Sequence, residues 1–234
     1  MMQEKEQKTD VSFGFLIQDD ATCHPGANQP VVQQHQLALF FLDIRDFTPF
    51  IASRSVLEVM HLLQQLFAIF RPAIQAHQGR IIETAGDGLY AVFGLEDTFE
   101  KAPSSALRAG LAILEGLAQA NEAFFGPCFN HHFQVGIGLH VGQVIVGQLG
   151  LGVNNNPTVM GYPVNVASRL QAATKRLNNS FIVSEEAFKL LVDPPLAACE
   201  WIDLKGIPAP LKVHLLGSPY DSAFCHESAW LMAS

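Results

Sequence analysis

The sequence predicts an α+β domain whose strands and helices follow one another in the order βαββαβ. An apolar run leads into a first strand at Leu37–Ile44, and apolar residues at steps of three and four then mark a helix over Val56–Ile74. Two short β-prone runs, Arg80–Ala85 and Leu89–Phe93, are joined by Gly86-Asp87-Gly88, which is typical of a hairpin. We therefore expect an antiparallel sheet with helices on one face, a ferredoxin-like core with additional C-terminal elements.

The second helix and the last strand of this core follow the hairpin. Pro103 suits the first turn of a helix whose apolar residues are Leu107, Leu111, Leu114 and Ala118. The stretch "FQVGIGLHVGQVIVGQLG" predicts two strands that turn near Val141-Gly142. After a loop rich in Gly and Asn, Pro163 is expected to open another helix, with an apolar face of Val166, Leu170, Ala173 and Leu177.

The helix over Val56–Ile74 carries more apolar surface than one packing face needs. Two neighbouring seams run along it, one formed by Val56, Met60, Leu63, Phe67, Phe70 and Ile74, and the other by Leu62, Leu66, Ile69 and Ala73. We expect such a helix to pack on the core and also on a partner. Pro72 lies inside the pattern and should bend the helix or mark a break.

Composition bounds the class of protein. The 234 residues are 49% hydrophobic and 15% charged, which suits one large domain with extensions. We expect an N-terminal extension over residues 1–35, with a short strand at Ser12–Ile17, a domain over 36–217 and a C-terminal tail over 218–234. The net charge of −8 argues against nucleic acid as a partner. A start unlike a signal peptide, and no apolar run near about 20 residues, favour a cytoplasmic protein without a membrane span.

Two acidic residues stand where chemistry is expected. Asp43 ends the first strand and Asp87 occupies the hairpin tip, and these strands can be neighbours in a βαββαβ sheet, so the carboxylates could converge. Paired carboxylates beside a phosphate-binding loop commonly hold Mg²⁺. Each residue alone also has an ordinary explanation, Asp87 as a turn former between glycines and Asp43 as a solvated strand end.

Three further polar residues suit an anionic ligand. Asn165 and Arg169 are four apart on the helix that opens at Pro163, so they share one face. An amide and a guanidinium presented together suit a ribose oxygen and a phosphate. Lys205 lies beside a turn glycine in "DLKGI". Ordinary solvated surface positions would also explain all three residues.

Four blocks of sequence resemble one family, the class III nucleotide cyclases, which comprise the catalytic domains of adenylate and guanylate cyclases. The blocks are "FLDIRDFTPF", "ETAGDGLYAVFG", "VGIGLHVGQVIVGQLG" and "VMGYPVNVASRL", followed by "DLKGI", and they span about residues 36–217. Any one block is weak, but the ordered set is specific. The resemblance implies a homodimer that uses two Mg²⁺ or Mn²⁺ ions to convert a nucleoside triphosphate into a cyclic monophosphate and pyrophosphate.

The resemblance also implies a role for each matched residue. Asp43 and Asp87 match the metal-binding aspartates, with Ile44 beside them, and the loop containing Phe47 and Thr48 matches the segment whose backbone touches the triphosphate. The remaining matches are implied to come from the second subunit: Asn165 orients the ribose, Arg169 stabilises the transition state and Lys205 binds the terminal phosphate.

Substrate choice and activity are where the resemblance is mixed. Glu83, at one base-selecting position, resembles guanylate cyclases, whereas Thr158, at the other, resembles a bacterial subclass and differs from them. We lean towards ATP because adenylate cyclases are common among bacterial members, and GTP stays open. Asp46 stands where the family usually has Gly, and Tyr162-Pro163 where Asp or Asn commonly follows Gly161. The extra charge of Asp46 and the presence of Glu83 motivate an alternative, a catalytically silent nucleotide-binding regulatory module.

Overall fold

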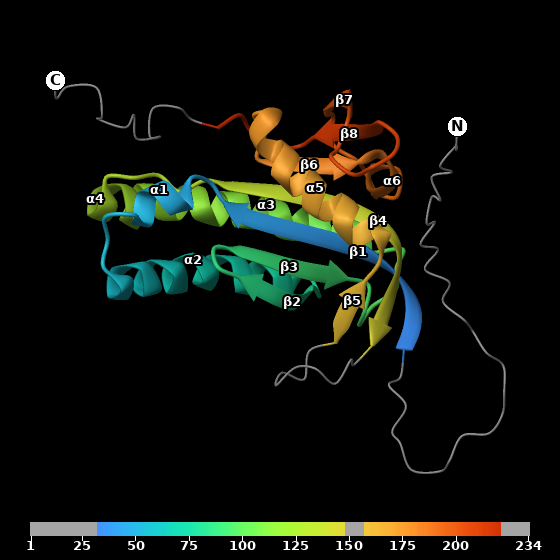
Figure 1. Ribbon diagram of the computed structural model, residues 1–234, viewed down its shortest axis with the longest axis horizontal. Coiled ribbons are helices and arrows are strands. Elements are labelled where there is room, and N and C mark those ends of the chain that lie inside the picture. The colour runs from blue at the N-terminus through green and yellow to red at the C-terminus, as the bar shows by residue number, and fades with distance from the viewer. Residues whose placement is uncertain (1–31, 148–156, 221–234) are drawn as a thin grey trace, which may run out of the picture.

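The computed structural model describes residues 32–147 and 157–220 as a sheet flanked by helices (Figure 1). In chain order the elements are β1 (Val32–Ile44), α1 (Phe47–Ile51), α2 (Val56–Ala76), β2 (Arg80–Ala85), β3 (Gly88–Phe93), α3 (Ala102–Ala120), the π-helix η1 (Asn121–Phe125), α4 (Gly126–Phe129), β4 (Val135–Gly147), β5 (Thr158–Met160), α5 (Tyr162–Arg176), β6 (Phe181–Ser184), α6 (Glu185–Phe188), β7 (Ala198–Ile202) and β8 (Leu211–Leu215). The strand expected at Ser12–Ile17 lies outside the described residues.

The strand order confirms the ferredoxin-like core. The sheet runs β2-β3-β1-β4-β6-β8-β7, with β5 paired to β4, and its first four strands are those of the βαββαβ unit. β1 begins at Val32, ahead of the domain start expected at residue 36, and pairs antiparallel with β4 along its whole length. On its other side β1 pairs antiparallel with β3 from Ala38 to Asp43. β1 is therefore the central strand of the core.

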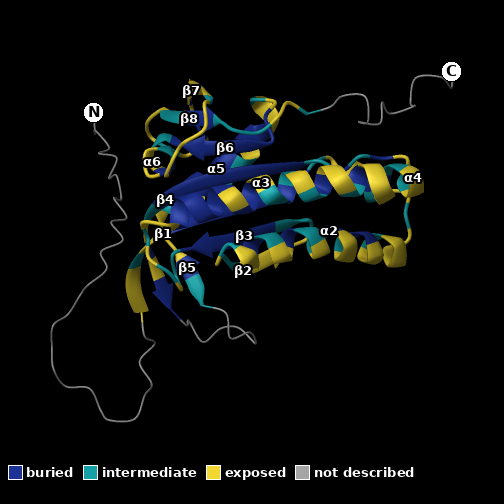
Figure 2. Cartoon of the chain, turned by 180° about the vertical axis from the view of Figure 1, so that it is seen from behind, coloured by how far each residue is buried: buried dark blue, intermediate teal, exposed yellow. Residues whose placement is uncertain are grey.

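Helices cover both faces of this central strand (Figure 1). The core helices α2 and α3 share one face, where they pack on alternate β1 residues such as Phe40 and Leu42. On the opposite face Leu37 and Leu39 pack in a second cluster with Ala167 of α5. Figure 2 shows the resulting buried sheet between the helices. Because both faces are covered, β1 needs apolar residues at successive positions, which explains its unbroken apolar run.

The two strands expected around Val141-Gly142 are a single strand, β4, and the expected turn is wrong. Val141 and Gly142 lie in the middle of the ladder with β1, opposite Ala38 and Leu37. The glycines serve helix packing instead. A Cβ on Gly142 would lie 2.6 Å from Pro163 Cβ, and one on Gly138 would lie 2.6 Å from the Ala167 carbonyl oxygen. Glycine in this strand marks the close approach of α5, not a change of chain direction.

Helix α2 differs from its expected pattern in two ways. It continues through Pro72 to Ala76, so the expected break does not occur. Its buried stripe combines members of both predicted seams: Leu62, Leu66, Phe70 and Ile74. Val56 and Met60 stay 81% and 51% exposed, which leaves an apolar surface at the start of the helix. Within the described ranges, no helix is both long enough and apolar enough to cross a bilayer.

The packing of α5 on β4 predicts a strong effect of one added methyl group. Gly138→Ala should lower the free energy of unfolding by at least about 2 kcal/mol, because its Cβ would meet the backbone of Ala167 and Gln171, which a side-chain rotation cannot relieve. Urea denaturation measures the change.

The matched control for this prediction is Gly116→Ala in helix α3. There the new Cβ meets only the Ile69 side chain, at 3.0 Å, and alanine favours helix. We expect a change within about 1 kcal/mol. Equal effects of the two substitutions would contradict this explanation of the β4 glycines.

Candidate active site

The β1–β3 ladder brings Asp43 and Asp87 together. Asp43, at the end of β1, pairs with Gly88, the residue that follows Asp87 in the chain. Gly86 turns the hairpin with a φ of 60°, a left-handed conformation that glycine adopts without strain. Glycine at position 88 also lets the two strands come close at this point, since a Cβ there would lie 3.1 Å from Asp43 Oδ1. Two acidic residues 44 positions apart in the sequence therefore line one cavity, of about 430 Å³.

Burial and the second carboxylate both act on Asp43. The pKa of its carboxyl is raised to about 6, first by burial and then by the negative charge of Asp87, while the neighbouring Arg45 guanidinium lowers it. A carboxyl with a raised pKa in a cleft is a common feature of functional sites. It marks a place where the folded protein concentrates negative charge.

The loop after β1 forms one wall of this cavity. Ile44, Phe47 and Thr48 all line it, so the structure brings these expected site residues to the aspartates. Phe47 is buried among the core residues, whereas Thr48 is exposed. Asp46 precedes helix α1 with a φ of 48°, the left-handed region that favours glycine and tolerates Asp.

Helix α5 forms the opposite wall through residues that the sequence did not single out. Gln171, Thr174 and Lys175 line the cavity. Gln171 and Lys175 are four apart on α5, so their helical spacing already placed both on one face. Nothing in the sequence pattern, however, predicted that the C-terminal half of this helix would lie against the end of β1.

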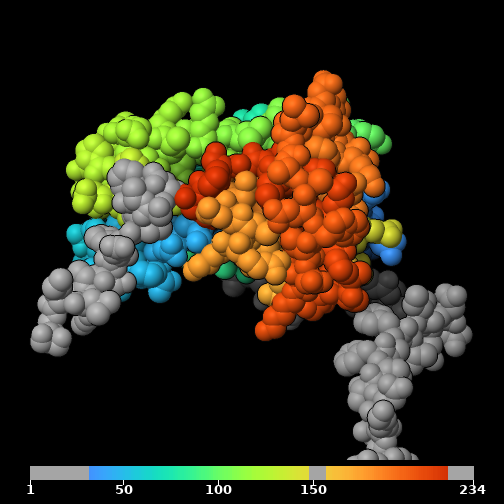
Figure 3. All heavy atoms as spheres, turned by 90° about the horizontal axis from the view of Figure 1, so that it is seen from above, coloured from blue at the N-terminus to red at the C-terminus, as the bar shows by residue number. Residues whose placement is uncertain are grey.

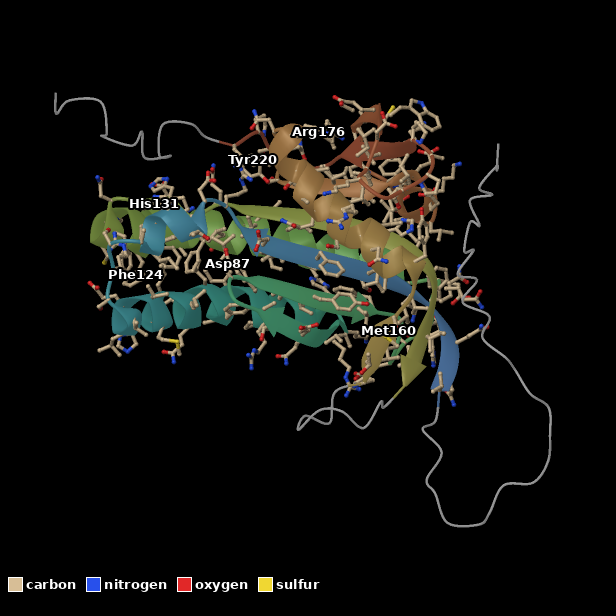
Figure 4. All side chains as sticks on the ribbon, in the orientation of Figure 1. Asp87, Phe124, His131, Met160, Arg176 and Tyr220 are labelled. Atoms are coloured by element: carbon tan, nitrogen blue, oxygen red, sulfur yellow. The ribbon has the colours of Figure 1, made fainter. Side chains whose placement is uncertain are left out.

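A residue of the expected tail also reaches this region. Tyr220 lies beside the end of α5 (Figure 4), and the Arg45 guanidinium sits 4.5 Å from the centroid of its ring, a cation–π contact. The backbone N–H of Tyr220 donates to Asn178 Oδ1 at 3.1 Å. Burial raises the pKa of the Tyr220 hydroxyl. These contacts hold the Arg45 side chain in place next to the aspartates.

The two expected base-selecting residues lie apart from each other. Glu83, on β2, lines a second cavity of about 340 Å³, together with Asp43, Tyr90 and Gln171. Thr158, half-buried on β5, is opposite Gly147 of β4 and lines neither cavity. The structure thus joins Glu83, but not Thr158, to the aspartate site of the same chain.

Asn165, Arg169 and Lys205 also lie away from the aspartates of their own chain. Asn165 and Arg169 are both exposed and one turn apart near the start of α5. Lys205 is exposed between β7 and β8. None of the three lines either cavity that contains Asp43. Within one copy, as far as the structure describes it, these three side chains therefore stay outside the cavities that contain Asp43.

Comparison with known proteins identifies the family. A family model described as the adenylate and guanylate cyclase catalytic domain matches residues 30–217, so the chain belongs to this family. Adenylate cyclase 1 of Rhizobium meliloti is 33% identical over 154 residues, which are 64% of this chain and 23% of that protein. An uncharacterized protein of Mycobacterium tuberculosis is 27% identical over 217 residues, 91% of this chain and 36% of that protein. The chain thus spans about a quarter to a third of these relatives.

Solved structures share the fold. The guanylyl cyclase Cya2 is similar with a TM-score of 0.72 and 21% identity, over 81% of this chain and 95% of that one. The adenylyl cyclase CyaB from P. aeruginosa gives a TM-score of 0.70 and 24% identity, over 82% and 96%. A bacterial light-regulated adenylyl cyclase gives 0.69 and 26%, over 82% and 54%.

The aspartate cavity fits the divalent metals that this family generally uses. Among the described residues, no group of three or more His, Cys, Asp and Glu side chains is arranged to hold a metal, so the two carboxylates stand as a pair. A pair of carboxylate ligands suits a hard cation that takes further oxygens from water and from a phosphorylated substrate. Such a cation would offset the negative charge of Asp87, which adds to burial in raising the pKa of Asp43.

The raised pKa of Asp43 predicts that this carboxylate costs stability in metal-free protein. Its carboxyl keeps a proton up to about pH 6 when folded but loses it near pH 4 when unfolded, so wild-type stability falls as pH rises through this window. Asp43→Asn should therefore be more stable than wild type by roughly 1 kcal/mol at pH 7, after allowance for partial exposure.

Urea denaturation of both proteins, with a chelator present, measures this difference at pH 7 and below pH 4. The advantage of Asp43→Asn should disappear below pH 4, where the wild-type carboxyl is protonated in both states. Asp193→Asn, in the exposed loop before β7, controls for the substitution itself. An advantage of Asp43→Asn that persists unchanged at acidic pH would rule out the charge as its cause.

Proposed function

We propose that this chain is a nucleotide cyclase that converts a nucleoside triphosphate into its 3′,5′-cyclic monophosphate and pyrophosphate, with ATP favoured over GTP. Membership of the cyclase catalytic domain family supports the proposal. The observation that carries it is the convergence of Asp43 and Asp87 in one cavity beside the Ile44–Thr48 loop. This is the arrangement that a phosphorylated substrate bound through metal ions requires.

In the proposed complex, Asp43, Asp87 and the backbone of Ile44 would hold two Mg²⁺ or Mn²⁺ ions. When bound, such ions neutralise the triphosphate and lower the pKa of the ribose 3′ hydroxyl. The deprotonated 3′ oxygen attacks the α-phosphorus, the bond from that phosphorus to the bridging oxygen breaks, and pyrophosphate leaves. The hydroxyl proton passes to water. Phe47 and Thr48 belong to the loop whose backbone would contact the phosphates.

The remaining site residues would come from a second copy of the chain. Asn165, Arg169 and Lys205 lie outside the aspartate cavities of their own copy, so a homodimer is the simplest way to complete the site. In this role Asn165 orients the ribose, Arg169 stabilises charge that develops on the α-phosphate, and Lys205 binds the terminal phosphate. The exposed apolar residues at the start of α2 provide surface for such a contact.

Base recognition would involve Glu83 and Thr158. Glu83 lines the cavity next to Asp43, so a base that occupied this cavity would meet a carboxylate acceptor. A carboxylate accepts hydrogen bonds from the N1–H and N2 amine of guanine, whereas adenine N1 needs a donor. Glu83 therefore favours GTP. The preference for ATP rests instead on how common adenylate cyclases are among bacterial members of the family.

One observation favours a second function, a nucleotide-binding regulatory module without turnover. Asp46 places a third carboxylate on the cavity of Asp43 and Asp87, which opposes an anionic substrate. Calorimetric binding of a triphosphate, with no cyclic product by mass spectrometry, would establish this alternative.

Purified protein with Mn²⁺ or Mg²⁺ and either ATP or GTP should form a cyclic nucleotide, identified by mass. Asp43→Ala should abolish turnover because the metal site is lost, and Arg169→Ala should lower it about a hundredfold or more. Lys189→Ala, whose side chain pairs with Glu185 on the surface, should leave the rate unchanged. If neither ATP nor GTP yields a cyclic nucleotide, the proposed cyclase activity is wrong.

A mixture of two inactive variants tests whether the site is shared. Asp43→Ala and Arg169→Ala should each be inactive as homodimers, but their mixture should recover turnover, because half of the heterodimer sites carry both intact groups. Rates are measured after the two proteins are mixed and allowed to exchange subunits. A mixture as inactive as its components, despite exchange confirmed by mass spectrometry, would contradict the shared site.

Replacing the carboxylate at the base cavity tests the role of Glu83. Glu83→Lys should shift the ratio of ATP to GTP turnover towards ATP, by about tenfold or more, because it exchanges an acceptor for a donor. The two rates are measured side by side on one preparation, with Glu96→Lys as a surface control. An unchanged ratio would argue that Glu83 does not contact the base.

A further inference from the structure

Lys175 is a cation that faces the aspartate cavity from the last turn of α5. It lines this cavity together with Asp43 and Asp87. Its side chain is 71% exposed, and its Nζ lies 3.8 Å from Asp46 Oδ1. Figure 3 shows the α5 region beside the blue segment that follows β1. An ammonium group thus stands between two elements of the cavity wall without being fixed by burial.

The two cations that line the aspartate cavity differ in how firmly neighbouring side chains fix them. Three carboxylates line it, those of Asp43, Asp46 and Asp87, and Arg45 and Lys175 supply the positive charge. Arg45 is anchored over the Tyr220 ring at 4.5 Å and lies 3.9 Å from Asp46 Oδ2. Lys175 has only the exposed contact with Asp46 among the interactions that the structure records for it. Of the two cations, Lys175 is the one free to change partner.

The position of Lys175 has a simpler explanation, which the geometry argues against. Basic residues in the last turn of a helix offset its dipole, and both Lys175 and Arg176 are there. Arg176, however, turns away and donates to the Asp203 carbonyl oxygen at 2.9 Å. Only Lys175 is directed to the cavity. The helix dipole explains why a positive charge is favourable at the end of α5. It does not explain why the Lys175 side chain meets Asp46, in the segment that follows β1.

We infer that Lys175 is a triphosphate-binding residue, supplied by the same copy of the chain as Asp43 and Asp87, with Asp46 as its resting partner. This inference rests on the proposed function. An exposed ion pair contributes little to stability, so Lys175 can exchange Asp46 for a phosphate oxygen at small cost. The flexible lysine stem allows the shift, and an ion pair with a multiply charged phosphate is the stronger one.

The exchange of Lys175 between Asp46 and a phosphate also explains how an aspartate can occupy position 46, where the left-handed backbone favours glycine. Asp46 holds the left-handed conformation, and Lys175 and Arg45 offset its charge when no ligand is present. When a triphosphate binds, Asp46 gives up Lys175 and becomes a repulsive neighbour. Asp46 therefore weakens binding while Lys175 strengthens it, although the two form one ion pair.

Two substitutions that break the same ion pair, Lys175→Met and Asp46→Asn, should change triphosphate affinity in opposite directions, and this difference tests the inference. Calorimetry with Mn²⁺ and a 3′-deoxynucleoside triphosphate, which binds but cannot cyclise, measures affinity without turnover. Lys175→Met should weaken binding about tenfold, because a charge-assisted contact is lost. Asp46→Asn keeps the left-handed backbone acceptable and should tighten binding a few-fold, because a negative charge is removed. The affinity for the nucleoside itself should stay unchanged in both.

The matched control is Lys189→Met. Lys189 is 70% exposed and pairs with Glu185 at 3.3 Å, so it resembles Lys175 in exposure and in having an acidic partner, but it does not line the aspartate cavity. It should leave triphosphate affinity unchanged. Urea denaturation confirms that each variant is folded.

Two results would overturn the inference: wild-type affinity in Lys175→Met, or equal weakening by Lys175→Met and Asp46→Asn, which would make the ion pair merely structural. Wild-type protein that binds the analogue but forms no cyclic nucleotide would overturn the proposed function alone. Wild-type protein that binds no triphosphate would overturn both.

Discussion

The candidate site depends on one pairing, that of Asp43 with Gly88 at the end of the β1–β3 ladder. The strand that carries Asp43 is buried on both faces, which leaves its register no freedom, because a shift by one residue would turn every side chain to the other face. The register therefore fixes where the Asp43 carboxylate emerges. The glycines around Asp87 bring the second carboxylate to the same point. Fold and site are set by the same ladder.

The β4 glycines fix the second wall of the cavity. Without side chains at Gly138 and Gly142, α5 approaches β4 closely enough to set Gln171 and Lys175 opposite the β1 loop. The same docking directs Asn165 and Arg169, on the first turns of α5, away from their own aspartates. One helix thus contributes to the aspartate cavity with its last turns, while the exposed side chains of Asn165 and Arg169 on its first turns lie outside that cavity.

The sequence predicted the core because its signals were local: an unbroken apolar strand, a helical period and a Gly-Asp-Gly turn. It failed where tertiary contacts decide. The glycines of β4 suggested a turn, but they accommodate α5, and Leu111, one of the apolar residues that marked helix α3, is 42% exposed. The structure also shows a capping box of Ser55 and Glu58 at the start of α2, which was not predicted from the sequence although its Ser-x-x-Glu spacing is typical of one. Lys175 and Tyr220 could not be found this way, because only the folded chain sets them against the β1 loop.

The aromatic ring beneath Arg45 has a consequence for where this domain ends. The family match stops at residue 217, yet Ser180 N–H donates to Ser218 O at 2.9 Å and Tyr220 stacks on Arg45. A protein truncated at residue 217 would retain every side chain that is expected to act in catalysis. It would lose the Tyr220 ring that supports Arg45. Anyone who fuses this unit to another domain should carry the polypeptide through position 220.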